Sequence, residues 1–266
     1  MLNAVNGSVC LEDFDMDYIR FGSGERVLVV LPGVGDGLKT VKGMALPFAV
    51  MYRSLAKKFT VYMFSRRVRL DPSMGTREMA GDLSRAMEAL GITKAAVVGI
   101  SQGGMIAQWL AIDHPELVDR LVLVVTIARP NPVIRDAIRT WQEMARRGDY
   151  KGIMVDTAER AYSEKRLKTA RILYSLLGNV GKPKSFRRFR IQARSCIKHN
   201  AYDELGRISC PVLVIGGTDD RIADGQASVE IAERIPGSRL KMYDGLGHGL
   251  YEEAPDFWEE VAAFCE

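Results

Sequence analysis

This chain has few cysteines and no long apolar runs. The first feature argues against a disulfide-rich or cysteine-ligated metal protein, and the second against a membrane-spanning protein. The four cysteines are widely scattered and show neither a disulfide framework nor a metal-ligand spacing, so we expect free thiols in a reducing cytoplasm. No apolar run approaches the roughly 18 residues of a transmembrane helix, so no membrane insertion is expected. The first residues lack the basic start and apolar stretch of a secretory signal. Its 47% apolar and 26% charged residues are ordinary for a soluble globular protein.

Common metal and nucleotide motifs are also missing. Residues 33–38 are rich in glycine and follow an apolar run, but they lack the third glycine of a dinucleotide-binding loop. Gly99 and Gly104 have the spacing of a phosphate-binding loop, but Met105 stands where that motif requires lysine. The H-E-x-x-H zinc motif does not occur. The sequence therefore implies no metal and no organic cofactor.

What the chain does contain is a serine between glycines, in the stretch G-I-S-Q-G-G at residues 99–104. The apolar run 95–98 precedes this stretch, and the helical pattern 105–111 follows it. A serine at the apex of so tight a strand-to-helix turn needs small neighbours, and it stands at the positive end of the helix. The pattern predicts that Ser101 is a catalytic nucleophile.

Histidine occurs only three times, which narrows the choice of a general base. His248 lies in a glycine-rich loop, residues 244–249, directly after an alternating strand pattern. His114 lies in a loop that ends a helix and is expected at the surface. His199, in a basic segment with a helical pattern, is a weaker candidate for contact with substrate. We predict that His248 takes the serine proton and returns it, since imidazole titrates near neutrality.

An acid that orients this histidine follows another short apolar strand, residues 211–215. The spacing of glycine, two residues and then an acid favours Asp220, while the adjacent Asp219 is expected to cap local backbone amides. Asp224 and Asp244 are weaker candidates. Serine, aspartate and histidine then occur in the order of an α/β-hydrolase triad, each at the end of a strand.

Attack by a serine on a carbonyl group builds negative charge on the carbonyl oxygen, which needs hydrogen-bond donors. The amide that follows the nucleophile, at Gln102, is one expected donor. The other is expected from the loop 32–37, which follows the apolar strand 27–31. Within that loop the sequence predicts the amide of Val34.

On these residues the chain resembles the α/β-hydrolase superfamily over nearly its whole length. Four motifs carry the resemblance: residues 31–35, 99–104, 217–220 and 247–248. Residues 104–108 look like the branch that holds enol-lactonases, small esterases and cofactor-free haloperoxidase-like enzymes. One departure is Pro32-Gly33, where the family often has His-Gly, but a backbone donor at the next residue can persist without that histidine.

The alternation of apolar runs and helical patterns favours an α/β fold, a mostly parallel central sheet with helices on both faces. Residues 76–90 are one such helical pattern, with Thr76 as its expected cap. The alternation stops at residues 129–205, which have helical periodicity and no evident strand. The resemblance implies a helical cap at this place. We therefore predict a hydrolase core of residues 1–128 and 206–266 and an inserted cap of residues 129–205, with Trp141 of that cap lining the pocket.

The inserted segment is strongly basic. It holds more than twice as many Lys and Arg as Asp and Glu residues, whereas the whole chain has a net charge of only +4. The densest run lies at residues 182–194. Three interpretations stay open: solvated helix faces, steering of an anionic substrate towards the cleft, and a polyanion or membrane-surface partner. A nucleic-acid partner is not expected, because stacking aromatics are not interleaved with the basic residues.

Together these observations predict a serine hydrolase that cleaves a small carboxylic ester, lactone or thioester through an acyl-enzyme. The same triad supports two alternatives of another reaction type, C–C bond hydrolysis and perhydrolysis. A third alternative is a ligand receptor that keeps the fold and the triad but turns over slowly.

Overall fold

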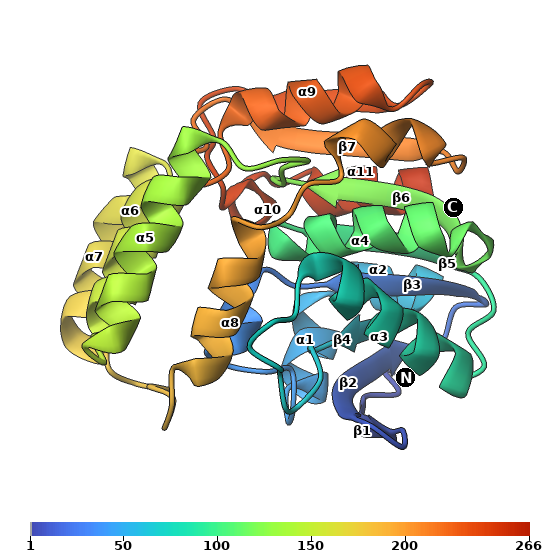
Figure 1. The fold of residues 1–266 in the computed structure, drawn as a ribbon, viewed down its shortest axis with the longest axis horizontal. Coiled ribbons are helices and arrows are strands. Elements are labelled where there is room, and N and C mark those ends of the chain that lie inside the picture. Colours follow the sequence, from blue (N-terminus) through green and yellow to red (C-terminus); the bar gives the residue numbers. More distant parts are fainter. Residues whose placement is uncertain (1) are drawn as a thin grey trace.

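An eight-stranded sheet forms the centre of the protein (Figure 1). The computed structural model describes residues 2–266, apart from the side chains of residues 172–177. The order of the strands in the sheet is β1-β2-β4-β3-β5-β6-β7-β8. β2 pairs antiparallel with β1 and with β4, and every later pair in that order is parallel. The strands are β1 (Val5–Cys10), β2 (Asp15–Gly22), β3 (Arg26–Leu31), β4 (Phe59–Phe64), β5 (Ala95–Ile100), β6 (Val118–Val124), β7 (Val212–Gly217) and β8 (Arg239–Tyr243).

The central strands are apolar throughout because both of their faces are buried. Successive side chains of β3 alternate between two separate core clusters, with Val29 and Leu31 in one and Leu28 and Val30 in the other. Helices α3 (Thr76–Ala89), α4 (Gln102–Asp113) and α9 (Gly225–Arg234) contribute to the first cluster. Helices α1 (Ala45–Met51), α2 (Arg53–Lys58) and α11 (Phe257–Cys265) contribute to the second. The predicted α/β-hydrolase fold, with helices on both faces of the sheet, is confirmed.

The start of α3 differs from the prediction. Gly75 is the residue before the helix, and its amide donates to the Glu78 side chain at 2.8 Å. Thr76 is the first helical residue, and its hydroxyl lies 2.8 Å from Nδ1 of His199. The prediction of Thr76 as the cap is therefore wrong, because this hydroxyl is engaged by a buried histidine from a distant part of the chain.

Four helices separate β6 from β7: α5 (Pro132–Arg146), α6 (Tyr150–Ala161), α7 (Glu164–Leu177) and α8 (Arg187–Cys196). They lie beyond the carboxyl ends of the strands (Figure 1). Their buried side chains form a further apolar cluster, in which Trp141 and Phe189 join Met105 of α4 and Ile222. The insertion is thus packed directly onto the end of the sheet where the predicted site residues lie.

The remaining elements are short: η1 (Val34–Gly37), η2 (Pro115–Leu117), η3 (Tyr202–Arg207) and α10 (Leu250–Glu253). All four cysteines are free, as the sequence predicts. Over the described residues, no helix is both long enough and apolar enough to cross a membrane.

Candidate active site

Ser101 occupies the turn between β5 and α4 in a strained backbone conformation, with φ of 55° and ψ of −120°. Glycines make the turn possible. A Cβ atom on Gly103 would lie 2.0 Å from the carbonyl oxygen of Leu31, and one on Gly99 would lie 2.6 Å from the Cα atom of Gly104. The tight strand-to-helix turn that the sequence predicts is present, and it forces this backbone close to the end of β3.

The neighbouring strand β6 holds the turn in place. The amide of Ser101 donates to the carbonyl of Val124 at 2.9 Å, and the Thr126 hydroxyl donates to the carbonyl of Ser101 at 2.7 Å. Val125, between Val124 and Thr126, has a φ of 43°, which a β-branched residue rarely adopts. Sequence reasoning missed Val125 and Thr126. The one feature of the sequence that could have indicated them is their position directly after β6, the strand that pairs with β5.

Asp220 and His248 form a buried pair at the ends of β7 and β8. Oδ2 of Asp220 lies 2.8 Å from Nδ1 of His248, and the two residues are 6% and 8% exposed. The other carboxylate oxygen, Oδ1, accepts the amides of Ile222 and Ala223 at 2.8 Å each. The carboxylate is therefore fixed by its own turn, and it in turn fixes the imidazole ring through Nδ1.

The other acidic candidates lie elsewhere. The carboxylate of Asp219 accepts the Thr218 hydroxyl at 3.3 Å, and the amides that it was expected to cap bind Asp220 instead. Asp224 accepts an amide of α9 at 3.1 Å, and Asp244 accepts the Thr218 hydroxyl at 3.2 Å. The capping role predicted for Asp219 is wrong, because one carboxylate, that of Asp220, makes both the local and the long-range bonds.

Ser101 and His248 line one cavity of about 320 Å³. Its other lining residues come from the loop after β3, from α1 and from the inserted helices, including Trp141 and Thr157. Trp141 thus lines the cavity as predicted, with its indole nitrogen donating to Asp156 at 2.7 Å. The volume lies within the range of small-molecule sites.

The two predicted oxyanion donors each begin a helix. Val34 is the first residue of η1 and Gln102 is the first residue of α4. Amides in the first turn of a helix have no partner within that helix, so both remain available to a ligand. The loop also approaches the serine closely, since a Cβ atom on Gly33 would lie 3.3 Å from Cβ of Ser101.

A buried polar network lies behind these donors. The side chain of Gln102 donates to the carbonyl of Gln192 in α8 at 2.8 Å and accepts from Arg66 at 3.2 Å. Asp36 of η1 accepts from Arg188 at 2.7 Å and from the Gln192 side chain at 2.9 Å. The network therefore connects α8 of the insertion to both predicted oxyanion donors.

The ionisation of this network follows from its burial and its charges. Burial raises the pKa of the Asp36 carboxyl, but the charges of Arg188 and Arg66 outweigh this, so that the pKa lies below its ordinary value. Burial lowers the pKa of Arg66. Arg188 belongs to the basic run of residues 182–194, but its guanidinium pairs with the fully buried carboxylate of Asp36, so it is not a solvated surface charge. Sequence reasoning missed Asp36, Arg66 and Gln192, since nothing in their local pattern marks them as buried.

The remaining histidines are not in the cavity. His199 is 2% exposed, and its ring nitrogens lie 2.8 Å from the Thr76 hydroxyl and 3.2 Å from Oε1 of Gln108. Burial lowers its pKa to about 3. His199, the weaker candidate for contact with substrate, has core side chains as its polar partners instead. His114 is half-buried, and its Nδ1 lies 3.7 Å from the Glu116 carboxylate.

Comparison with known proteins agrees with this fold. A family model described as "alpha/beta hydrolase fold" matches residues 26–150. The chain is 26% identical over 252 residues to a Caulobacter protein named "Putative carbamate hydrolase RutD", a match that covers 88% of each chain. The structure is similar to an α/β hydrolase from a Medee basin deep-sea metagenome library, with a TM-score of 0.82 at 20% identity over 96% of this chain and 95% of the other.

It is also similar to the enol-lactonase from Burkholderia xenovorans LB400, with a TM-score of 0.80 at 21% identity over 97% of this chain and 99% of the other. The fold, the family model and the curated relatives agree with one another. The chain has the α/β-hydrolase fold, and the curated relatives and structural neighbours that it matches are hydrolases of that type.

Proposed function

We propose that the protein is a serine hydrolase that cleaves a small carboxylic ester, lactone or thioester with Ser101, Asp220 and His248. The observation that carries this proposal is the shared cavity. Ser101 and His248 both line it, and Asp220 binds the imidazole nitrogen that does not face the reaction. A nucleophile, a base and an orienting acid are what acyl transfer at a serine requires.

The chemistry follows from the hydrogen bonds. With Nδ1–H donated to Asp220, the neutral imidazole of His248 has a lone pair on Nε2, which takes the Ser101 proton as Oγ attacks the carbonyl carbon. The amides of Val34 and Gln102 stabilise the resulting oxyanion. His248 then protonates the leaving group as its bond to the carbonyl carbon breaks. Water, deprotonated by the same imidazole, attacks the acyl-enzyme and releases the acid and Ser101.

The inserted helices act as the cap in this proposal. Residues 129–205 supply Trp141 and Thr157 to the cavity, opposite the loop after β3 and the α1 side chain Phe48. The lining is mainly apolar, and Lys39 is its one basic side chain. None of the arginines of the insertion lines the cavity, which favours an uncharged acyl group over an anionic one. The relatives named for a carbamate and an enol-lactone fit the same carbonyl chemistry.

Labelling with a fluorophosphonate probe tests the nucleophile. One equivalent of probe is expected to react with the wild type and none with Ser101→Ala. Ser228→Ala, which alters a buried serine of α9, serves as the matched control and should label fully. Persistent labelling of Ser101→Ala would refute the triad.

Turnover of a panel of short p-nitrophenyl esters and lactones then tests the reaction class. We expect rates well above the uncatalysed reaction that are lost in Ser101→Ala. A wild type that is labelled by the probe but turns over none of the panel would instead support the slow ligand receptor.

A further inference from the structure

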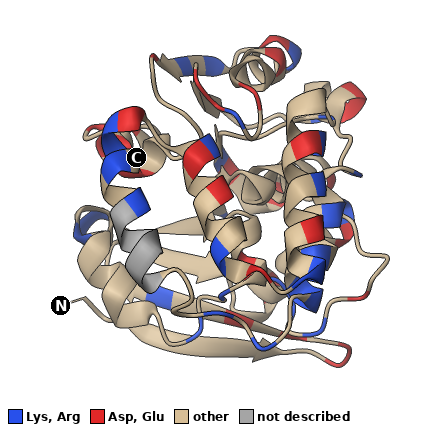
Figure 2. Cartoon of the chain, turned by 90° about the vertical axis from the view of Figure 1, so that its left-hand side faces the viewer, with Lys and Arg blue, Asp and Glu red and all other residues tan. Residues whose placement is uncertain are grey.

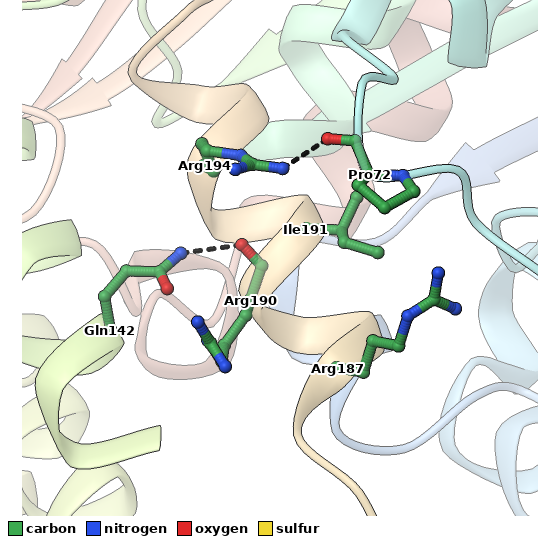
Figure 3. Close-up of a pocket in the computed structure, with 6 residues that line it drawn as sticks. All are labelled: Pro72, Gln142, Arg187, Arg190, Ile191 and Arg194. Atoms are coloured by element: carbon green, nitrogen blue, oxygen red, sulfur yellow. Dashed lines mark hydrogen bonds between the residues drawn. The ribbon is translucent and has the colours of Figure 1, made fainter. Parts of the chain in front are cut away.

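A second cavity, of about 230 Å³, lies on the outer side of α8 (Figure 3). Three exposed arginines of that helix, Arg187, Arg190 and Arg194, line it around the buried Ile191. They are spaced by three and four residues, so they project from one face of the helix. Figure 3 shows Arg187 and Arg194 extending towards the Pro72 side of α8 and Arg190 extending towards Gln142. This face is the opposite of the one that carries Arg188 and Gln192 into the buried network.

The side chains around the groove bind backbone carbonyl oxygens, which do not neutralise the positive charge of the arginines. Gln142 of α5 donates to the carbonyl of Arg190 at 2.6 Å, and Arg194 donates to the carbonyl of Pro72 (Figure 3). Both contacts use backbone oxygens, so neither neutralises an arginine. Helix α8 is therefore fixed between α5 and the loop at Pro72 while its guanidinium groups keep their charge.

These arginines differ from the others in the insertion. Arg160, Arg171 and Arg188 each pair with a carboxylate at 2.9 Å or less. Among the described residues, no carboxylate lies within 4 Å of a guanidinium nitrogen of the three groove arginines.

Asp71, next to Pro72, is the acid that interacts electrostatically with Arg187. It accepts the amide and the hydroxyl of Ser73 at 2.7 and 2.5 Å, and these hydrogen bonds, with a smaller effect of Arg187, lower its pKa. Since Asp71 is engaged by Ser73, it offsets only part of one charge. The groove thus concentrates positive charge that the protein itself does not balance.

We propose that this groove binds a phosphate group, either as inorganic phosphate or as the phosphomonoester of a small molecule. Guanidinium groups offer planar pairs of N–H donors that match the oxygens of a phosphate, and several of them balance a dianion. The cavity is smaller than the pockets of drug-sized ligands, which suits one small anion better than an extended polyanion. The site is separate from the proposed function, because the groove and the Ser101 cavity share no lining residue.

Calorimetric titration with inorganic phosphate and with phenyl phosphate, at constant ionic strength set by NaCl, tests this assignment. We expect saturable one-to-one binding of at least one of the two, weakened at least tenfold in Arg187→Gln/Arg190→Gln. Tighter binding of phenyl phosphate would identify a phosphomonoester as the occupant, and tighter binding of phosphate would identify the free ion. The variant is expected to fold, because both side chains are exposed and unpaired; its melting temperature checks this.

Two further variants distinguish specific binding by the groove arginines from nonspecific electrostatic attraction to a basic surface. Arg135→Gln/Arg139→Gln removes two exposed charges of the neighbouring helix α5 and is expected to change the affinity less than twofold. Arg187→Lys/Arg190→Lys keeps the charge but loses the planar fork of N–H donors, and it is expected to bind the phosphate probes several-fold more weakly than the wild type.

Three results would overturn the proposal: no saturable binding, equal losses in the two glutamine variants, or full affinity in the lysine variant. Unweakened binding in the groove variants would overturn it as well, because the anion would then bind outside the groove, and this result would leave the triad assignment untouched.

Discussion

Two acidic side chains that follow the carboxyl ends of strands, Asp36 and Asp220, are buried and paired, whereas most charged side chains of the inserted helices are exposed or half-buried. Asp220 is 6% exposed and bonds His248, and the side chain of Asp36 is fully buried against Arg188. By contrast, the pair of Arg147 and Glu143 in α5 has side chains that are 65% and 58% exposed. Figure 2, in which the inserted helices face the viewer, shows basic and acidic residues interspersed along them.

This contrast separates two uses of charge. A buried charge must be paired, so it fixes the position of its partner and is costly to remove. An exposed charge is screened by water and salt and contributes little to stability. Helix α8 carries both kinds of charge: Arg188 pairs with the buried Asp36, and its neighbour Arg187 lines the groove on the outer side. The variants below test each side of the contrast.

The largest expected effect is at the buried carboxylate that orients the base. Asp220→Asn should lower kcat by about 10³–10⁴, because an amide favours the wrong tautomer of His248. Asp219→Asn is the matched control, one residue away and with its carboxylate bonded to Thr218, and should keep most of the activity. Steady-state kinetics on a reactive ester checks both variants. A greater loss in Asp219→Asn would show that the neighbouring acid had been misassigned.

The second effect is on stability, where the insertion meets the core. Asp36→Ala leaves the buried cation Arg66 and the half-buried Arg188 without their carboxylate, which should lower the free energy of unfolding by about 3–5 kcal/mol. Glu143→Ala breaks an exposed pair within α5 and should cost less than about 1 kcal/mol. Unfolding in urea measures both. Equal losses would mean that burial does not distinguish the two kinds of pair.

The sequence predicts the strand ends better than the buried network, for a physical reason. Ser101, Asp220 and His248 each lie in the turn or loop that follows a strand, and parallel strands bring their carboxyl ends to one edge of the sheet. A local sequence pattern therefore indicates which distant residues meet. Asp36 and Arg188 are 152 positions apart in the sequence, and no local sequence pattern indicates that they form a pair.

The same limit applies at two other places. A helical pattern specifies which face of α8 is apolar, with Ile191 and Ala193 buried, but it does not specify which arginine finds a carboxylate behind that face. Thr76 is a good capping residue by local rules, yet a histidine 123 positions away engages its hydroxyl. Local rules fail where a buried polar group finds a distant partner.

The third effect is a pH dependence of stability that comes from His199. Its pKa is lowered by burial to about 3, below the ordinary value of 6.5 for an unfolded chain. Between these values the unfolded state binds the proton and the folded state does not, so stability is lost as the pH falls below about 6.5, by at most ~1.4 kcal/mol per unit.

Urea unfolding at intervals from pH 7 to pH 5 measures this slope. His199→Gln should flatten this slope relative to the wild type, because it removes the buried imidazole. An unchanged slope in His199→Gln would assign the pH dependence to other groups.

The smallest effect expected is on the rate, from the exposed arginines of α8. Arg187 and Arg190 do not line the Ser101 cavity, so they can act on a substrate only through the field that they contribute outside it. Salt screens such a field within about 8–10 Å at physiological ionic strength. We therefore expect kcat/KM for a carboxylate-bearing ester to fall only a few-fold with added salt, and that for a neutral ester of equal size to stay nearly constant.

Charge reversal in Arg187→Glu/Arg190→Glu should remove most of this salt dependence and leave the neutral ester unaffected. Arg188 is excluded from this variant, since reversing a buried partner of Asp36 would disturb the loop of the proposed oxyanion donors instead of the surface field. Arg135→Glu/Arg139→Glu, with the same change of charge on α5, shows whether the position on α8 matters. Identical salt responses of the two esters in the wild type would show that the exposed charges of the insertion do not contribute to substrate capture. In that case only the buried charges would affect activity or stability.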